Sequence, residues 1–199
     1  RKSFNRQESG LHQHGTARIV VGLSQDGILP TRNFHQGEFE FAEDISGEAM
    51  TNTILSGRGS CYACGVACKR KVDVPELGVT AKYGGPEYET VASLGSLCGV
   101  GDLRIIAQGN QVCAEYGLDT ISTGVAIAFA MECFERGILS QADTGGLDLR
   151  FGNGEAMVEM IHRIGRREGL GDLLAEGVAR AAERLGQEGQ RYALHVKPQ

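Results

Sequence analysis

Tryptophan is absent from the sequence, and aromatic residues of any kind make up only 6% of its 199 residues. No apolar run reaches the roughly 20 residues that a membrane-spanning helix needs, and the sequence contains no secretory signal pattern. The net charge of −5 gives no basic surface of the kind that nucleic acids require. We therefore expect neither a membrane span nor a nucleic-acid partner. Six cysteines without a secretory signal predict a reducing cytoplasm.

Three of those cysteines lie within eight residues, in the sequence Cys-Tyr-Ala-Cys-Gly-Val-Ala-Cys. Cys61, Cys64 and Cys68 have C-x2-C-x3-C spacing, and the basic triplet Lys-Arg-Lys follows at residues 69–71. Thiolates so close in sequence can converge on one inorganic centre, and iron–sulfur clusters are held by cysteine thiolates, normally four of them. The basic triplet would offset part of the negative charge that thiolates and sulfides bring.

Other interpretations of the thiols remain open. A structural zinc site usually has a second C-x2-C pair or a Cys/His mixture, but the chain has no second pair and no histidine between residues 36 and 161. A disulfide between such close neighbours would strain the loop. Unligated thiols are the third alternative. Cys98, Cys113 and Cys133 occur in apolar helical surroundings and are expected to be buried and inert.

The hydrophobic periodicity predicts a mainly α fold: a multihelical domain with a small irregular cysteine-bearing lobe and at most one short hairpin. The lobe is expected at about residues 57–86 and the helical bundle at about 87–187. The hairpin is predicted from residues 72–76 and 78–82. Helices are predicted over residues 15–26 with Thr16 as cap, 45–57 with Ser46 as cap, 87–98, 102–116, 119–136, 154–168, and 172–185 with Asp172 as cap.

Two further stretches carry polar groups that could do chemistry. Residues 85–90, Gly-Pro-Glu-Tyr-Glu-Thr, place Glu87 and Glu89 at a helix start. A carboxylate there can simply interact with the helix dipole, or it can act as a general acid/base when it is buried beside a cofactor. Residues 116–124 contain Gly117, Leu118 and Asp119 at another helix start. That segment can be an ordinary N-cap, or it can hold a polar heterocycle or phosphate.

Together these stretches resemble the tungsten- or molybdenum-containing aldehyde:ferredoxin oxidoreductase family. The resemblance runs over nearly the whole chain, from Leu-Pro-Thr-Arg-Asn-Phe at residues 29–34 to His-Val-Lys at 195–197. It implies the helical middle domain of such an enzyme over residues 1–199. The chain lacks an initiator methionine and ends on an extended-looking segment, so we expect a fragment that lacks the N- and C-terminal domains of the same polypeptide.

The resemblance also implies roles for the singled-out residues. Cys61, Cys64 and Cys68 would be three ligands of a [4Fe–4S] cluster, with the fourth supplied by a later domain. Glu89, with Glu87 as the alternative, matches the acid near the metal and substrate. Gly117, Leu118 and Asp119 match a segment that contacts the pterin of a bis-pterin tungsten or molybdenum centre. The family motif tends to begin with Asp five positions before Asp119, where this chain has alanine.

The function implied is oxidation of an aldehyde to a carboxylic acid, with electrons passed through the cluster to ferredoxin. Ferredoxin, an aldehyde substrate and a homo-oligomeric copy are the expected partners. Both cofactors are expected to be absent or incomplete in the isolated fragment, which would then be inactive by itself. Two alternatives are a family member that reduces an aromatic thioester, and a helical binding or structural module with a zinc-bound cysteine loop.

Overall fold

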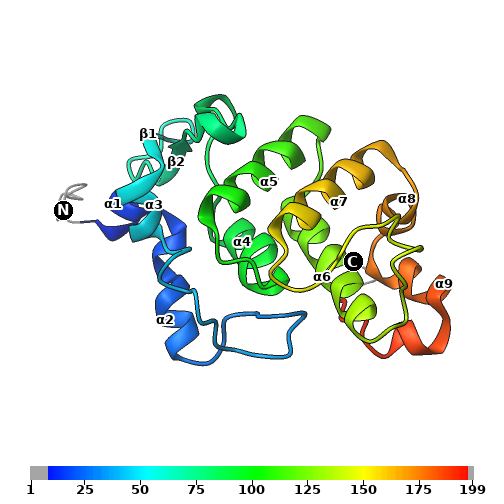
Figure 1. Cartoon of the computed structure of the whole chain (residues 1–199). Coiled ribbons are helices and arrows are strands. Elements are labelled where there is room, and N and C mark those ends of the chain that lie inside the picture. Colours follow the sequence, from blue (N-terminus) through cyan, green and yellow to red (C-terminus); the bar gives the residue numbers. More distant parts are fainter. Residues whose placement is uncertain (1–8, 197–199) are drawn as a thin grey trace.

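The protein is mainly helical, with one short two-stranded antiparallel sheet, in a computed structural model that describes residues 9–196. This confirms the predicted fold class. Figure 1 shows the sheet and the first helices at one end of the molecule and α8 and α9 at the other. The helical and strand elements are α1 (Gly10–His14), η2 (Thr16–Ile19), α2 (Val20–Gln25), α3 (Gly47–Thr53), β1 (Leu55–Gly59), β2 (Lys69–Val72), η3 (Pro75–Leu77), η4 (Ala81–Tyr83), α4 (Tyr88–Thr90), η5 (Val91–Gly95), η6 (Ser96–Cys98), α5 (Leu103–Tyr116), α6 (Thr120–Glu135), α7 (Gly154–Arg166), α8 (Leu170–Leu174) and α9 (Val178–Gln190).

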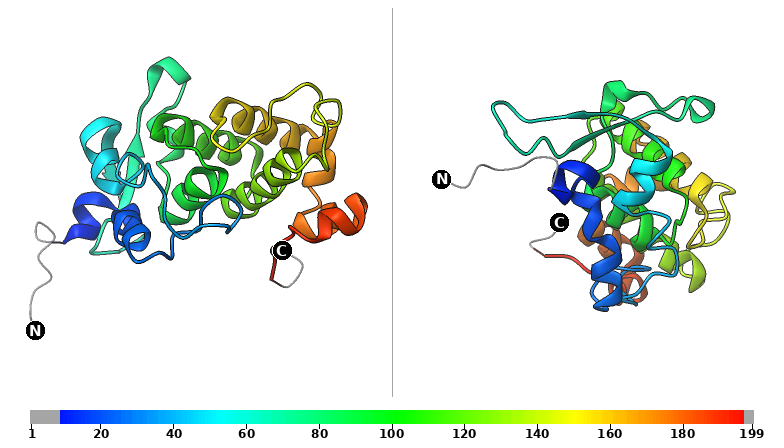
Figure 2. Two further views of the ribbon diagram at one scale, coloured as in Figure 1. Left: turned by 60° about the horizontal axis from the view of Figure 1, so that its bottom comes forward. Right: turned by 90° about the vertical axis from the view of Figure 1, so that its left-hand side faces the viewer.

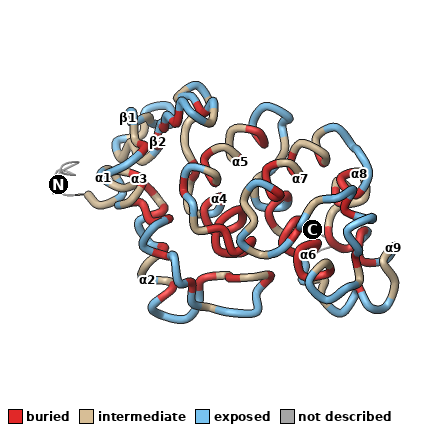
Figure 3. Tube along the Cα trace, viewed as in Figure 1, coloured by how far each residue is buried: buried red, intermediate tan, exposed pale blue. Residues whose placement is uncertain are grey.

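Helix α6 is the centre of the hydrophobic core. Ten of its residues are buried, because its sequence is apolar nearly all round and such a helix must be covered on every side. Helices α5 and α7 lie beside each other next to it, and their buried residues belong to the same core (Figures 1 and 3). The predicted central position of residues 119–136 is therefore correct.

The boundaries of α5 and α6 follow the polar residues and glycines that the sequence provides. The Asp102 carboxylate accepts a hydrogen bond from the Arg104 N–H at 2.9 Å, and the Asp119 carboxylate accepts one from the Ser122 N–H at 2.7 Å. Gly117 ends α5 with a φ of +71°, a conformation that costs glycine little. The capping residues therefore fix both helices within a residue or two of their predicted bounds.

The hairpin is not where the sequence predicted it. Strand β1 pairs with β2 in register Arg58↔Arg70 and Gly59↔Lys69, so the hairpin encloses the cysteine stretch. Val74 and Val79 in the predicted hairpin form only an isolated bridge. Strands β1 and β2 consist mostly of lysine, arginine, glycine and serine, and lysine and glycine are rare in strands. Their composition therefore did not indicate a hairpin.

Four predicted helices differ from those observed. The 15–26 segment forms the 3-10 helix η2 followed by the α-helix α2. The 45–57 helix is shortened to α3, with Ser46 as its cap as predicted, since the chain then enters β1. The 87–98 helix is broken into α4, the π-helix η5 and the 3-10 turn η6. The 172–185 helix is two helices, α8 and α9, because Gly177 interrupts it with a φ of +87°.

Two capping predictions are also wrong. Asp172 lies in the first turn of α8 rather than at a cap position. Thr16 lies inside η2, and its hydroxyl contacts the start of α4 instead of capping its own helix. A hydroxyl near a helix start is a capping signal only when no tertiary partner competes for it.

No single helix among residues 9–196 has the length and apolar composition to cross a membrane; the segments Tyr88–Cys98 and Leu103–Tyr116 meet that criterion only as a pair, bent by 117°.

Candidate functional site

The cysteine stretch forms the loop of the β1–β2 hairpin, which projects from one end of the molecule (Figure 2). Cys61 is exposed, whereas Cys64 and Cys68 are half-buried. The Cys64 N–H donates to the Cys61 carbonyl at 3.1 Å, so the C-x2-C segment is a turn. Ala63 and Ala67, directly before Cys64 and Cys68, have φ values of +54° and +52°. Left-handed alanine costs energy and persists where the surroundings enforce it.

The donor set of this loop fits an iron–sulfur cluster in kind and in sequence spacing. Three thiols are presented on a solvent-facing loop, and soft thiolates are the ligands that such clusters require. Within residues 9–196, however, no three His, Cys, Asp or Glu side chains lie together closely enough to hold one metal ion, and this includes the trio. The loop carries the ligands but does not by itself gather them around a centre.

The other three cysteines are buried in the core, as the sequence predicted. Burial raises the pKa of the Cys98 thiol, and it raises the pKa of Cys113 and Cys133 to about 12. A thiol that resists ionisation is a poor metal ligand and nucleophile. These three residues therefore act as packing groups.

Arg70 is the residue that ties the loop to the rest of the molecule. Its side chain is only 2% exposed, and its guanidinium donates to the carbonyls of Cys68 at 2.9 Å, Gln13 at 2.8 Å and His12 at 2.9 Å. A weaker bond of 3.3 Å reaches Ala67. From the sequence, the 69–71 triplet was expected only to supply counter-charge. Strand alternation would have shown that the middle residue points inward.

Glu87 and Glu89 are placed differently at the start of α4. Glu87 is half-buried and accepts a hydrogen bond from the Thr16 hydroxyl at 2.5 Å. The same hydroxyl accepts from the Tyr88 N–H at 2.8 Å. Glu89 is exposed, and burial followed by the nearby Glu89 charge raises the pKa of the Tyr88 phenol. Of the two candidate acids, Glu87 is the one held in a fixed position.

The Gly117–Asp119 segment lies next to this acid-bearing turn. Thr90, which ends α4, contacts Thr120 through their hydroxyls at 2.8 Å, and Thr120 follows Asp119 directly. Asp119 serves as the N-cap of α6 and also lines a largely apolar cavity of about 920 Å³ with Phe34, Ile121, Val178 and Leu194. The structure thus brings the two polar stretches together, although they are about 30 residues apart in sequence.

A basic cavity of about 570 Å³ lies between the hairpin and the segment that leads to Glu87. Lys69, Lys71 and Lys82 line it together with Arg70. The three lysines are all of the lysines among residues 9–196, and none of the three forms an ion pair with another described residue. An otherwise acidic chain therefore concentrates unpaired positive charge beside the cysteine loop.

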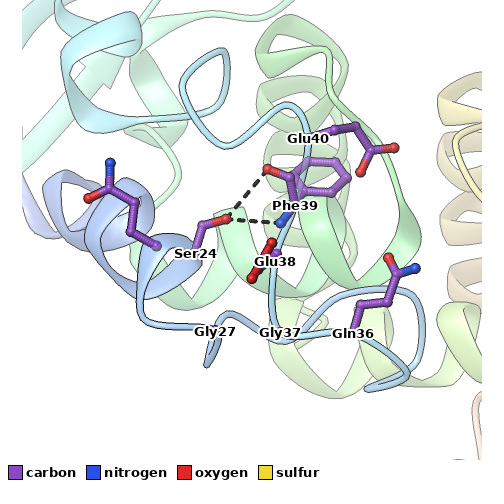
Figure 4. A pocket seen from close by; sticks show the side chains of 8 residues that line it. Ser24, Gly27, Gln36, Gly37, Glu38, Phe39 and Glu40 are labelled. Atoms are coloured by element: carbon purple, nitrogen blue, oxygen red, sulfur yellow. Dashed lines mark hydrogen bonds between the residues drawn. The ribbon is translucent and has the colours of Figure 1, made fainter.

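Another cavity, of about 760 Å³, lies away from these residues, between α2 and the loop that follows it (Figure 4). The Ser24 hydroxyl accepts from the Phe39 N–H at 2.9 Å and closes its wall. Gly37 approaches Gly27 so closely that a Cβ would overlap the Gly27 carbonyl. The contacts here hold the loop in place and bring no nucleophile or metal ligand set together.

Comparison with known proteins adds family relationships. A family model described as aldehyde ferredoxin oxidoreductase, domains 2 and 3, matches residues 1–199. The chain is 45% identical over 193 residues to a tungsten-containing aldehyde ferredoxin oxidoreductase of Pyrococcus abyssi, covering 96% of this chain and 31% of that protein. It is 46% identical over 189 residues to a protein of the same description from Thermococcus kodakarensis, covering 94% of this chain and 30% of that protein.

Two more distant similarities were found. An aliphatic sulfonate oxidoreductase, WOR-like subunit, of Pyrococcus furiosus is 35% identical over 178 residues, covering 84% of this chain and 28% of that protein. Among solved structures, the active-site complex BamBC of benzoyl coenzyme A reductase superposes with a TM-score of 0.70 at 24% identity, over 92% of this chain and 26% of that chain. At that identity the likeness shows the fold alone. The chain spans about 31% of the length of the Pyrococcus abyssi relative.

Proposed function

The chain belongs to the aldehyde ferredoxin oxidoreductase family, and we propose that it forms the helical middle part of an enzyme that oxidises an aldehyde to a carboxylic acid. The supporting observation is the identity of about 45% to tungsten-containing members across nearly the whole chain. The overall reaction adds water to the aldehyde and releases two electrons and two protons. Further domains of the same polypeptide would supply the remainder of the active site.

In this proposal Cys61, Cys64 and Cys68 hold three corners of a [4Fe–4S] cluster, and a later domain supplies the fourth ligand. Their position in the loop of the hairpin, with Cys61 exposed and Cys64 and Cys68 half-buried, supports this arrangement, because a partner domain can reach the loop. Such a cluster would relay electrons singly between a two-electron reaction and a one-electron carrier. The six cysteines are all free thiols, which suits the reducing cytoplasm.

Gly117, Leu118 and Asp119 are proposed to contact the pterin of a tungsten or molybdenum cofactor. That metal, held by pterin dithiolenes, would accept the electrons of the aldehyde carbon. Support comes from the contact between Thr90 and Thr120, which places this segment beside the acid-bearing turn. Asp119 is also the N-cap of α6, and a helix start favours polar or anionic groups.

Glu87 is the residue we favour as proton acceptor, and Glu89 is the alternative. A general base must be held within hydrogen-bond reach of the proton that it removes. Thr16 holds one carboxylate oxygen of Glu87, and Glu87 lines the cavity beside the hairpin. Glu89 is exposed in this part of the polypeptide and would need a cover from another domain before it could act in a water-excluded site.

Ferredoxin is the proposed electron acceptor, and the lysine-lined cavity supports it. Lys69, Lys71 and Lys82 place unpaired positive charge next to the cysteine loop, and the Tyr62 ring at the loop tip is fully exposed. Positive charge beside the exit point of electrons would attract an acidic carrier and raise its association rate.

The test uses the full-length protein prepared without oxygen. We expect aldehyde-dependent reduction of a viologen dye, tungsten or molybdenum, and about four iron atoms per chain that give a reducible visible band. A Cys64→Ser variant should lose iron and dye reduction, whereas Cys133→Ala, in a buried thiol outside the loop, should keep both. Zinc in place of iron would overturn the proposal in favour of a structural cysteine loop.

A further inference from the structure

One short segment of the chain, residues 12–16, touches both the cysteine loop and the candidate acid. It runs from the last turn of α1 into η2 and contacts Arg70 and Val66 on one side and Glu87 and Tyr88 on the other. We propose that this segment is a positioning strut that fixes the cysteine loop relative to Glu87, with Arg70 and Thr16 as its two anchors. The inference rests on the proposed function, because it assigns the two ends to one redox site.

The anchor at the loop end is a buried guanidinium. Arg70 donates to the His12 and Gln13 carbonyls of the strut and to the Cys68 and Ala67 carbonyls of the loop. The planar fork of arginine can satisfy several carbonyls at once, which the single ammonium of lysine cannot do in the same geometry. The Arg70 side chain thereby holds Ala67 and the candidate cluster ligand Cys68 against the strut.

A second bond joins the strut to the loop. The His12 ring nitrogen Nδ1 lies 2.9 Å from the Val66 carbonyl, midway between Cys64 and Cys68. The loop is thus held at Val66, Ala67 and Cys68. Because these contacts come from a helix end, they limit the ways in which the C-x3-C half of the loop can move.

The anchor at the acid end is the Thr16 hydroxyl, which has one acceptor partner and one donor partner. Its oxygen accepts from the Tyr88 N–H, so its single proton goes to the Glu87 carboxylate. This pair of bonds fixes both the start of α4 and the direction of the carboxylate. Loss of the hydroxyl would leave the N–H donor and the carboxylate without that partner.

Close packing between the anchors makes the strut stiff. Gly15 has a φ of +70°, and a Cβ on it would lie 3.1 Å from Arg70 Cδ. Gly85, two residues before Glu87, also packs on this side chain, since its Cβ would lie 3.1 Å from Arg70 Cβ. The Arg70 side chain is therefore in close contact with both the strut and the segment that carries the acid.

The buried Arg70 guanidinium brings a positive charge to the contact between the strut and the cysteine loop. It forms no ion pair with a carboxylate among residues 9–196, so a negatively charged group bound by the loop would be a favourable neighbour.

A double-mutant cycle in the full-length holoenzyme tests the strut. Arg70→Lys and Thr16→Val should each lower kcat by about tenfold, which corresponds to about 1.4 kcal/mol. The kcat of the double variant should be at least fivefold higher than the value expected if the two single effects multiplied, because both changes release the same segment. Thr16→Ser should recover most of the loss. Independent, multiplicative effects would overturn the proposal.

Two readouts do not depend on turnover. The reduction potential and paramagnetic spectrum of the cluster should change in Thr16→Val, although Thr16 itself does not touch the loop. In protein freed of metal, proteolytic cleavage after the exposed Tyr62 should accelerate in Arg70→Lys and in Thr16→Val. An unaltered cluster signal and unaltered cleavage in Thr16→Val would show that the acid end is not coupled to the loop.

Arg58 offers a matched control. Its guanidinium bonds the same His12 and Gln13 carbonyls at 3.2 and 3.3 Å, but from the exposed side of the hairpin. Water can replace those bonds, so Arg58→Lys should stay within about twofold of wild type. Wild-type protein without iron or aldehyde oxidation would contradict the proposed function. The cleavage assay would still decide whether the strut holds the loop.

Discussion

At the scale of single residues, Glu132 is a buried carboxylate that stabilises the strained turn at residues 32–34. It is 2% exposed and contacts His35 at 2.5 Å and Arg136 at 2.9 Å, with Asn33 at 3.5 Å. Arg32, Asn33 and Phe34 are three consecutive residues with positive φ, a conformation that costs energy for residues other than glycine. The Asn33 contact to Glu132 and the backbone bonds of this turn to η6 offset that cost.

Replacing Glu132 with alanine should lower the free energy of unfolding by about 1–2 kcal/mol, because buried Asn33 loses one acceptor while water can still hydrate the half-exposed His35 and Arg136. The control is Glu159→Ala. Glu159 pairs with Arg163 at the same i,i+4 spacing but is 39% exposed, so its loss should cost less than about 1 kcal/mol. Urea unfolding followed by far-UV circular dichroism measures both. Equal losses would contradict a special role for the buried carboxylate.

Two aspartates separate stability from cofactor binding. Asp102 and Asp119 are both N-caps, so each change to alanine should lower the free energy of unfolding by about 1 kcal/mol. If Asp119 also contacts the pterin, only Asp119→Ala should reduce the pterin and tungsten content of the full-length enzyme. Fluorescence of the extracted, oxidised pterin provides the measurement. Equal pterin content in the two variants would leave Asp119 with the capping role alone.

At the scale of elements, the close contact between α6 and η5 depends on a missing side chain. A Cβ on Gly124 would lie 2.6 Å from the Ser93 backbone, closer than real Cβ atoms approach. The Cys98 thiol fills the adjacent space and donates to the Ser93 carbonyl at 3.3 Å. The π-helical turn of η5 therefore lies directly on the central helix.

Gly124→Ala should destabilise the protein by about 2 kcal/mol, because the added methyl group must push η5 away from α6. Gly22→Ala is the opposite case. Gly22 lies in α2 with open space around its Cβ position, so alanine there should stabilise the helix by about 0.5–1 kcal/mol. Thermal unfolding of the two variants should shift the melting temperature in opposite directions. A shift of the same sign in both would refute the packing argument.

The elements that could be predicted from sequence are those whose ends are encoded locally. Asp102, Gly117 and Asp119 bound α5 and α6 as expected, because their capping bonds depend only on neighbours in the chain. The break of the 87–98 helix could not be predicted. The π-helical η5 arises from packing against α6, a contact between segments about 30 residues apart.

The candidate site shows the same division between local and long-range information. Sequence spacing was enough to propose Cys61, Cys64 and Cys68, but their grouping around a cluster stays a prediction. The strut was missed because Arg70 and Thr16 contact partners far away in sequence. Only the inward direction of Arg70 was encoded locally, because residues alternate between the two faces of β2. That strand was not among the predicted elements.

At the scale of the whole molecule, the six cysteines divide between the projecting hairpin and the buried core. The loop cysteines lie on the projecting hairpin, while Cys98, Cys113 and Cys133 are buried around α6 (Figures 1 and 3). In the metal-free protein an alkylating reagent should therefore modify the loop thiols rapidly and the core thiols only after unfolding. The redox chemistry proposed for the loop is thus separated from the thiols that stabilise the core.

The burial of the core thiols makes the free energy of unfolding depend on pH in the alkaline range. The pKa of Cys113 and Cys133 is about 12 in the folded protein, against about 8.5 for an ordinary thiol. Above about pH 8.5 the unfolded chain loses protons that the folded protein keeps, so stability is full below that pH and falls as pH rises toward 12. Each thiol contributes a slope of up to about 1.4 kcal/mol per pH unit.

Urea unfolding of metal-free protein between pH 8 and 11 should show this decline. A variant with Cys113→Ala and Cys133→Ala should show a shallower decline, because two groups that resist ionisation in the folded state are gone. The matched control carries Cys61→Ser and Cys64→Ser in the loop and should keep the wild-type slope. Other groups that titrate in the same range are shared by the wild-type protein and the Cys113/Cys133 variant, so the difference in slope between these two proteins isolates the buried thiols. Identical slopes would show that the core admits enough water for these thiols to ionise in the folded state.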